Sequence, residues 1–169
     1  MKKNYRFLII FICMFIAGYA SLKSGEGINA KKIKNEVDEY YSKFSAQSML
    51  GNIKTVNKLS TEWDGEITKY IDKEDKVCRC SIVVFGEGGK SELEYWLLDK
   101  YVYVSELKEY YSYPIYIDYT RPVDILYRTL NEYIIYKDKV YLLEGGYFKK
   151  TENKLPVNSL EEIDKAMEE

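Results

Sequence analysis

The sequence predicts an α+β fold in which an N-terminal amphipathic helix packs on an antiparallel β-meander of about six strands, followed by a short C-terminal helix. Two hydrophobic periods support this prediction. Apolar residues recur every three or four positions over residues 31–44, as on one face of a helix, and at every second position from residue 66 onward, as in strands. The 169 residues are 46% hydrophobic and 15% aromatic, which is enough for a core and argues against a disordered chain.

The first twenty residues have the layout of a secretory signal. Three basic residues precede an unbroken apolar run from Phe7 to Ala17. A helix of that length spans about 16 Å, whereas a bilayer core is about 30 Å thick. Small residues at positions 18 and 20 predict cleavage after Ala20, with Ala30 as a second candidate. The alternative is an uncleaved anchor that reaches Leu22.

This layout divides the chain into a signal peptide (1–20), a flexible linker (21–29) and a single α+β domain (30–169). We expect a secreted or extracytoplasmic protein associated with the cell envelope, with membrane contact only through an uncleaved N-terminal segment. Without residues 1–20 the chain has 22 basic and 27 acidic residues, and this net charge of −5 argues against nucleic acid as a partner.

The amphipathic helix is predicted from Lys31 to Phe44, with Asn29 as its N-cap. Its apolar face consists of Ile33, Val37, Tyr40, Tyr41 and Phe44. Such a face packs on a sheet more often than it binds a partner. Gly51 is the latest position at which this helix is expected to end. Toward the other end of the chain, Ser159 opens a capping box that predicts a short helix from Leu160 to Glu168.

Short runs of strand-forming residues, separated by charged or Gly-rich turns, predict the strands. These runs are Glu66 to Asp72, Lys76 to Phe85, Ser91 to Leu98, Tyr101 to Leu107, Tyr133 to Tyr136 and Val140 to Leu143. In the second run, alternation places Cys78, Cys80, Ile82 and Val84 on one face. The glycines after Phe85 predict a tight hairpin there.

Two of the hairpins resemble each other. The stretch from Glu94 to Val104 aligns with the stretch from Glu132 to Leu142, each an aromatic strand, an Asp/Lys turn and an apolar strand. With this repeat and the Gly-rich hairpin, the region from Trp63 to Phe148 resembles small uncharacterised bacterial exported proteins built from repeated Tyr-rich hairpins. The resemblance covers about half of the chain. It implies an antiparallel meander, and it carries over no catalytic or binding residues.

Tyrosine is the residue type that most needs an explanation, because the chain has 18 of them. They are densest in the segment from Tyr110 to Arg121. Aromatic rings whose hydroxyls stay in contact with water suit stacking on sugars or docking of a protein. Arg121 supplies a cation beside them. The predicted binding residues are Tyr113, Tyr116, Tyr119 and Arg121. The alternative is that these tyrosines reflect AT-rich codon usage and strand propensity.

Residues that carry chemistry are few. The chain has no His, which excludes Ser/His/Asp triads and imidazole-bound metals. Cys78 and Cys80 are expected in the core, with a redox or interchain role as the alternative, and they lack further ligands for a metal. A glycosidase-like carboxylate pair would combine Glu62 or Asp64 with Glu92 or Glu94, provided that the fold brings them together. We therefore expect no enzyme, no metal and no cofactor.

The function we expect is that of an extracytoplasmic binding or accessory module. It would recognise a protein or a glycan of the cell envelope through the Tyr-rich segment. The alternative is a carrier of a small apolar ligand, held between the helix and a curved sheet. A carrier requires an internal cavity lined by Tyr40, Tyr41 and Trp96, whereas a recognition module requires a filled core and an exposed aromatic patch.

Overall fold

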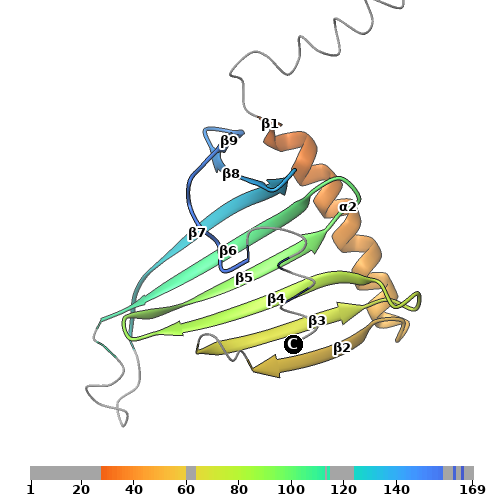
Figure 1. Cartoon of the computed structure of the whole chain (residues 1–169), viewed down its shortest axis with the longest axis horizontal. Helices are drawn as coiled ribbons and strands as arrows, with labels where there is room; N and C mark the ends of the chain where they lie inside the picture. Colours follow the sequence, from red (N-terminus) through yellow and green to blue (C-terminus); the bar gives the residue numbers. More distant parts are fainter. Residues whose placement is uncertain are drawn as a thin grey trace, which may run out of the picture.

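The computed structural model describes residues 28–59, 64–112, 114, 124–157, 162 and 165. Within these residues, one helix lies against one antiparallel sheet of nine strands, in the order β1-β9-β8-β7-β6-β5-β4-β3-β2 (Figure 1). The helix is α2 (Ala30–Met49). The strands are β1 (Ile28–Asn29), β2 (Lys54–Leu59), β3 (Gly65–Ile71), β4 (Val77–Gly86), β5 (Gly89–Leu97), β6 (Val102–Tyr111), β7 (Ile125–Tyr136), β8 (Lys139–Glu144) and β9 (Tyr147–Lys150).

The α+β prediction is confirmed, but the sheet has nine strands instead of about six. The additional strands carry little sequence signal, because β1 and β9 are short and β2 is mostly polar. The first half of β7 was also not expected as strand. The predicted signal, most of the linker and nearly all of the predicted helix from Leu160 to Glu168 lie outside the described residues, so no C-terminal helix is described.

The helix begins and ends where the local chemistry requires. Asn29 caps α2, because its side-chain oxygen accepts a hydrogen bond from the Lys31 N–H at 2.9 Å. Gly51 has a φ of +69°, a left-handed conformation that glycine adopts without strain, and it follows the last helical turn. The helix continues beyond Phe44 to Met49, since the residues between them include neither Gly nor Pro.

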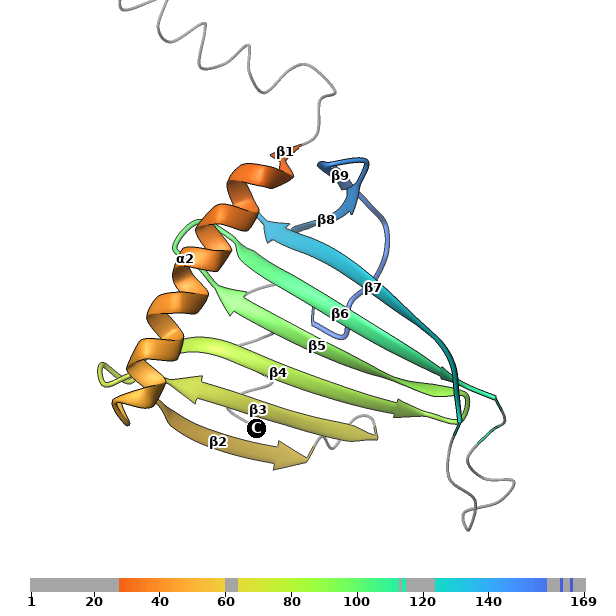
Figure 2. The same ribbon diagram turned by 180° about the vertical axis from the view of Figure 1, so that it is seen from behind.

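The helix α2 crosses one face of the sheet near one end of the strands, as Figure 2 shows from behind. We name this side of the sheet the helix face. Its central row consists of the cross-strand neighbours Arg79, Trp96, Tyr103 and Ile134. The rings of Tyr40, Tyr41 and Phe44 meet Trp96 edge-on, with centroids 6.4, 5.5 and 5.3 Å away.

Polar contacts fix the helix in register with the strands beneath it. The Tyr101 hydroxyl donates to the Glu36 carboxylate at 2.7 Å. The Lys34 ammonium lies 2.7 Å from the Glu132 carboxylate, which also accepts from the Tyr103 hydroxyl. The first two contacts join α2 to the sheet, and the third orients the Glu132 carboxylate. The helix is therefore held by specific polar contacts as well as by apolar packing.

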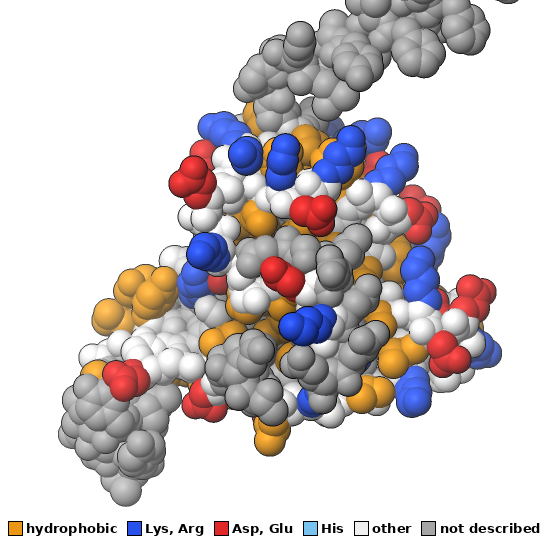
Figure 3. Space-filling view, viewed as in Figure 1, with side chains coloured by type: hydrophobic (Ala, Val, Ile, Leu, Met, Phe, Trp, Pro, Cys, Tyr) orange, Lys and Arg blue, Asp and Glu red, His pale blue; other side chains and the backbone are white. Residues whose placement is uncertain are grey.

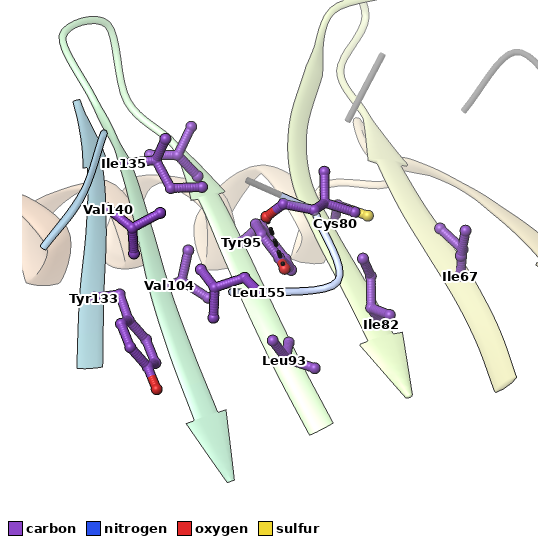
Figure 4. Packing of buried hydrophobic residues seen from close by; sticks show 12 residues of the cluster. Ile67, Cys80, Ile82, Leu93, Tyr95, Val104, Tyr133, Ile135, Val140 and Leu155 are labelled. Carbon is purple, nitrogen blue, oxygen red and sulfur yellow. Dashed lines mark hydrogen bonds between the residues drawn. The ribbon is translucent and has the colours of Figure 1, made fainter. Parts of the chain in front are cut away.

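The opposite side of the sheet, the strap face, has a second core (Figure 4). Its buried members from the sheet are Ile67, Cys80, Ile82, Leu93, Tyr95, Val102, Val104, Tyr133, Ile135 and Val140. Residues 151–157, which we name the strap, cross this face without regular secondary structure. Leu155 and Val157 of the strap are buried in this cluster, and the Tyr95 hydroxyl donates to the Val157 carbonyl at 3.3 Å. The strap therefore covers the face that α2 leaves open.

Candidate functional site

The far end of the sheet, opposite the end that α2 crosses, is the candidate functional site. It holds the turn between β4 and β5, the last residues of β6 and the first residues of β7. The predicted binding residues, Tyr113, Tyr116, Tyr119 and Arg121, lie outside the described residues. The structure therefore defines the surroundings from which the Tyr-rich segment departs.

The first half of β7 forms a sheet edge. β8 pairs only with Tyr133–Tyr136, so among the described residues no strand lies along the outer side of residues 125–132. Edge strands usually carry charges or are very short, because their unpaired N–H and C=O groups otherwise attract other strands. β2, at the other edge, is protected in this way by Lys54 and Lys58, whereas this half of β7 carries one charged residue before Glu132, namely Arg128.

Apolar side chains cover this free half of β7. Leu126 is 66% exposed, Leu130 63% and Tyr127 51%, and Ile125 and Phe85 are also exposed. Figure 3 shows apolar side chains gathered at the left edge of the molecule, over the end of the sheet where β7 begins. Exposed apolar patches on small proteins often mark interaction surfaces. We name these five residues, together with the Tyr-rich segment, the far-end surface.

At the far end, two tyrosines on the strap face stack against each other. Tyr110 of β6 lies directly opposite Tyr127 of β7, with ring centroids 4.3 Å apart and ring planes at 16°. Beside Tyr110 lies a pocket of about 320 Å³ between the β4–β5 turn and the end of β6. It is lined by Val84, Phe85, Gly86, Gly88, Gly89, Lys90, Ser91, Lys108, Glu109 and Tyr110. This volume is at the lower end of the range for small-ligand pockets.

The charged groups around the pocket are paired with one another. Arg128 donates from Nε to the Glu109 carboxylate at 2.7 Å, and this hydrogen bond is the main reason that the pKa of Glu109 is lowered. The Lys90 ammonium lies 2.7 Å from Glu92 and 3.3 Å from Glu109, and the Glu92 hydrogen bond is the main reason that its pKa is raised. These residues alternate with Tyr110 and Tyr127 along the strands, so the paired charges lie on the helix face, behind the stacked tyrosines.

A buried carboxylate lies further along the strap face. Glu106 accepts hydrogen bonds from the Tyr133 hydroxyl at 3.0 Å and from the Asn131 amide at 3.1 Å. The Lys108 ammonium lies 3.1 Å from its other oxygen. The carboxylate is therefore satisfied by three partners, which is what a buried charge requires.

The residues named for a carrier cavity pack against Trp96, and Tyr40 also lines an open pocket of about 240 Å³ beside the turn between β5 and β6. Tyr40 and Tyr41 contact Trp96 edge-on, and burial raises the pKa of Tyr40 to about 12. The Tyr40 hydroxyl donates to the Cys78 carbonyl at 3.3 Å. The side chains therefore fill the region between the helix and the sheet at this point.

Cys78 and Cys80, the two cysteines within the described residues, are buried and unpaired, as expected for core residues. Burial raises the pKa of the Cys80 thiol to about 12, and burial also raises the pKa of Cys78. The Cys78 thiol donates to the Tyr70 carbonyl at 3.1 Å. Thiolates are the reactive form of cysteine, so neither group is poised as a nucleophile.

Two of the carboxylates considered for a glycosidase pair, Glu92 and Glu94, have other partners, and Asp64 is exposed. Glu94 accepts from Arg79 at 2.6 Å and Glu92 lies against Lys90, while Glu62 is outside the described residues. Among the residues that the structure describes, no group of three or more Cys, Asp or Glu is placed to hold a metal ion. The described geometry thus offers contact surfaces and a pocket as the features with which to bind a partner.

The free half of β7 is the part of this site that sequence reasoning missed. Its residues, from Ile125 to Leu130, are rich in strand-forming side chains, and this density was the signal available. Within the part of the chain that is described, no helix is both long and apolar enough to span a bilayer. In comparisons with known proteins, the chain matches no family model, no curated protein and no solved structure.

Proposed function

We propose that the protein is an extracytoplasmic binding or accessory module, which recognises a protein or a glycan of the cell envelope through the far-end surface. The observation that supports this is the exposed apolar cluster on the free half of β7, next to the point where the Tyr-rich segment leaves β6. The cluster and the last residues of β6 lie at the end of the sheet that α2 does not cross.

The free edge of β7 can contribute to binding as well as its side chains. An unpaired strand edge offers main-chain hydrogen bonds to an extended segment of a partner, and neighbouring side chains supply the selectivity. Leu126 and Leu130 lie four residues apart on the same face of β7, on either side of Arg128, which is paired with Glu109. This face therefore presents two exposed leucines along the edge. Tyr127 adds an aromatic ring on the other face.

The packing around Trp96 supports the module over the alternative carrier. A carrier holds its ligand in an enclosed apolar space, and the helix rings already occupy that place. The module needs a filled core and an exposed aromatic surface. The stack of Tyr110 on Tyr127, with the latter half exposed, supplies such a surface.

Capture of partners from a cell-envelope fraction tests this function. The test variants are Leu126→Lys/Leu130→Lys and Tyr113→Ala/Tyr116→Ala, and each is expected to weaken capture about tenfold or more, as for central interface residues. Met49→Lys/Leu50→Lys is the matched control, because both residues are apolar side chains at the end of α2 and are more exposed than Leu126 and Leu130. Unchanged capture by both test variants, with the fold intact by circular dichroism, would contradict the proposal.

The proposed location has its own test. Mass spectrometry of the protein isolated from its native cells is expected to give a chain that begins after Ala20. A mature chain that retains Met1 would contradict the secreted location and would leave the far-end surface to be tested on its own.

A further inference from the structure

The pocket beside Tyr110 is a gap in a cross-strand row of side chains. On the strap face, Gly86 is opposite Gly89, Gly89 is opposite Tyr110, and Tyr110 is opposite Tyr127. The two tyrosines fill their places with stacked rings, and the two glycines leave theirs without side chains. A flat ring placed against Tyr110 would continue the stack.

Only one of the glycines around this gap is required by the fold. A Cβ on Gly89 would lie 2.1 Å from the Glu109 carbonyl oxygen, so β5 needs glycine there to approach β6. A Cβ on Gly86 would meet only the Gly89 carbonyl, at 3.5 Å, and one on Gly88 would meet nothing within 4 Å. Neither backbone is in the left-handed region that favours glycine. The backbone conformation therefore does not require glycine at Gly86 or Gly88, and the absence of side chains there keeps the pocket open.

The next cross-strand row supplies polar groups to the pocket. Val84, Ser91 and Lys108 are neighbours across β4, β5 and β6, and all three line the pocket. The Ser91 hydroxyl can donate and accept, and the Lys108 ammonium can donate beyond its contact with Glu106. The pocket therefore combines an aromatic wall with a few hydrogen-bonding groups, which is the usual make-up of a small-ligand site.

The charges of the pocket select against an ionic ligand. Lys108 is paired with Glu106, and Lys90 is paired with Glu92 and Glu109. Lys90 and Glu109 alternate with Gly89 and Tyr110 along their strands, so their side chains point to the helix face and Lys108 supplies the ammonium on the side of the stack. An anion would have to compete with Glu106 for this ammonium, and a cation would be repelled by it. A ligand with many hydroxyls and no charge can use the same donors and acceptors without breaking the pairs.

We infer that this pocket binds one uncharged sugar ring of a glycan. The C–H face of the pyranose lies on Tyr110, and its hydroxyls exchange hydrogen bonds with Ser91 and Lys108. This inference rests on the proposed function for the place of binding, and it goes further by naming the ligand class. The place of the ring beside the Tyr110–Tyr127 stack fixes which side of the far-end surface a glycan would follow.

Saturation-transfer NMR with neutral oligosaccharides tests the site. The probes are maltotriose and the trisaccharide of N-acetylglucosamine, and the full chain is expected to bind at least one of them with a Kd below about 1 mM. Gly86→Val, which fills the gap, is expected to weaken binding about tenfold or more, and Tyr110→Ala, which removes the aromatic wall, is expected to do the same. Glu87→Ala changes the same turn outside the pocket and is the control.

Several results would overturn the inference. They are the absence of saturation transfer to either saccharide, equal binding by a folded Gly86→Val variant, or binding of N-acetylphenylalanine amide without binding of sugars, which would assign the pocket to an aromatic side chain of a protein. The two proposals fail separately. If Leu126→Lys/Leu130→Lys abolishes capture and no saccharide binds, the far-end surface stands as a protein-binding surface and the sugar site is wrong.

Discussion

Arg79 and Trp96 are directly opposed on β4 and β5, and the Arg79 guanidinium lies 4.7 Å from the centre of the Trp96 ring. The same guanidinium is 4.5 Å from the ring centre of Tyr70 and 5.6 Å from that of Phe44. Its Nε donates to Glu94 at 2.6 Å. A cation thus occupies the middle of the contact between helix and sheet, where three rings and one carboxylate hold it.

Replacement of Arg79 is expected to destabilise the fold. Arg79→Ala removes the contacts with the rings and leaves Glu94 without its partner, which should lower the free energy of unfolding by about 1–3 kcal/mol. Arg79→Lys should lie between wild type and Arg79→Ala, because an ammonium keeps the charge and loses the planar stacking. Urea unfolding measures both changes.

Lys32→Ala is the control for this series, since the Lys32–Glu36 pair is exposed and 3.9 Å long. It should change the free energy of unfolding by less than about 0.5 kcal/mol. An Arg79→Ala variant as stable as Lys32→Ala would show that the ring contacts contribute nothing.

Replacement by alanine should destabilise the fold at Gly89 and leave its stability unchanged at the adjacent Gly88. Gly89→Ala places a methyl group against the Glu109 carbonyl, and the backbone of β5 must move away, so we expect a loss of about 1–3 kcal/mol. Gly88→Ala meets open space and should be tolerated. Thermal unfolding of the two variants side by side measures the difference. Equal stability of the two would mean that β5 does not approach β6 as closely as the structure shows.

The thiols should be unreactive in the folded protein. Burial raises the pKa of both, so at about pH 8 almost no thiolate is present to attack a disulfide reagent. Cys78 and Cys80 should be modified by Ellman's reagent only in denaturant, which mass spectrometry of the labelled peptides can verify. Rapid labelling of both in native buffer would contradict their burial.

The protein should lose stability in alkaline solution. Burial raises the pKa of five described tyrosines, that of Tyr133 to about 12. The others are Tyr40, Tyr95, Tyr101 and Tyr103. The unfolded chain loses these protons near pH 10, while the folded chain keeps them. The folded state therefore binds more protons than the unfolded state in this range, and the free energy of unfolding falls as the pH rises.

This stability is present in full below about pH 9 and is lost from about pH 10 upward, with the Cys80 thiol adding to the loss. Urea unfolding at a series of pH values measures the decline. The absorbance of tyrosinate should rise in two stages, first for exposed phenols and then together with unfolding. A single rise near pH 10 with unchanged stability would show that the phenols are not buried.

Local signals in the sequence were sufficient for much of the fold. Asn29 at the start of α2 and Gly51 after its end follow from capping chemistry that involves only a few neighbours. The alternation that places Cys80 and Ile82 on one face of β4 is equally local, and both are 1% exposed. The rings of most tyrosines in the sheet interior, such as Tyr95, serve packing as expected.

The rest depended on contacts between distant parts of the chain. β2 has little alternation of its own and is a strand because β3 supplies a full-length partner. Leu155 and Val157 lie in an irregular segment, and only the path of the strap across the sheet makes them core residues. No period in the sequence indicates such a path.

The candidate site likewise combines features that local sequence predicts with features that depend on distant contacts. The tyrosine composition predicted binding by the segment from Tyr110 to Arg121, whose predicted binding residues lie outside the described residues. The exposure of Leu126 and Leu130, by contrast, depends on where β8 stops pairing with β7. The gap beside Tyr110 depends on registers that bring Gly86 and Gly89 into its row. Registers between strands are set by turns and by the whole sheet, so residue spacing did not give them.

The strap has a consequence for the order of folding during synthesis. Leu155 and Val157 follow all of the described strands, so a nascent polypeptide can pair β3 to β9 while the apolar surface over Leu93 and Tyr95 still faces water. That surface is sealed only after residue 157 has left the ribosome. A chain that ends after Lys150 would therefore leave this apolar surface uncovered and would be prone to aggregate.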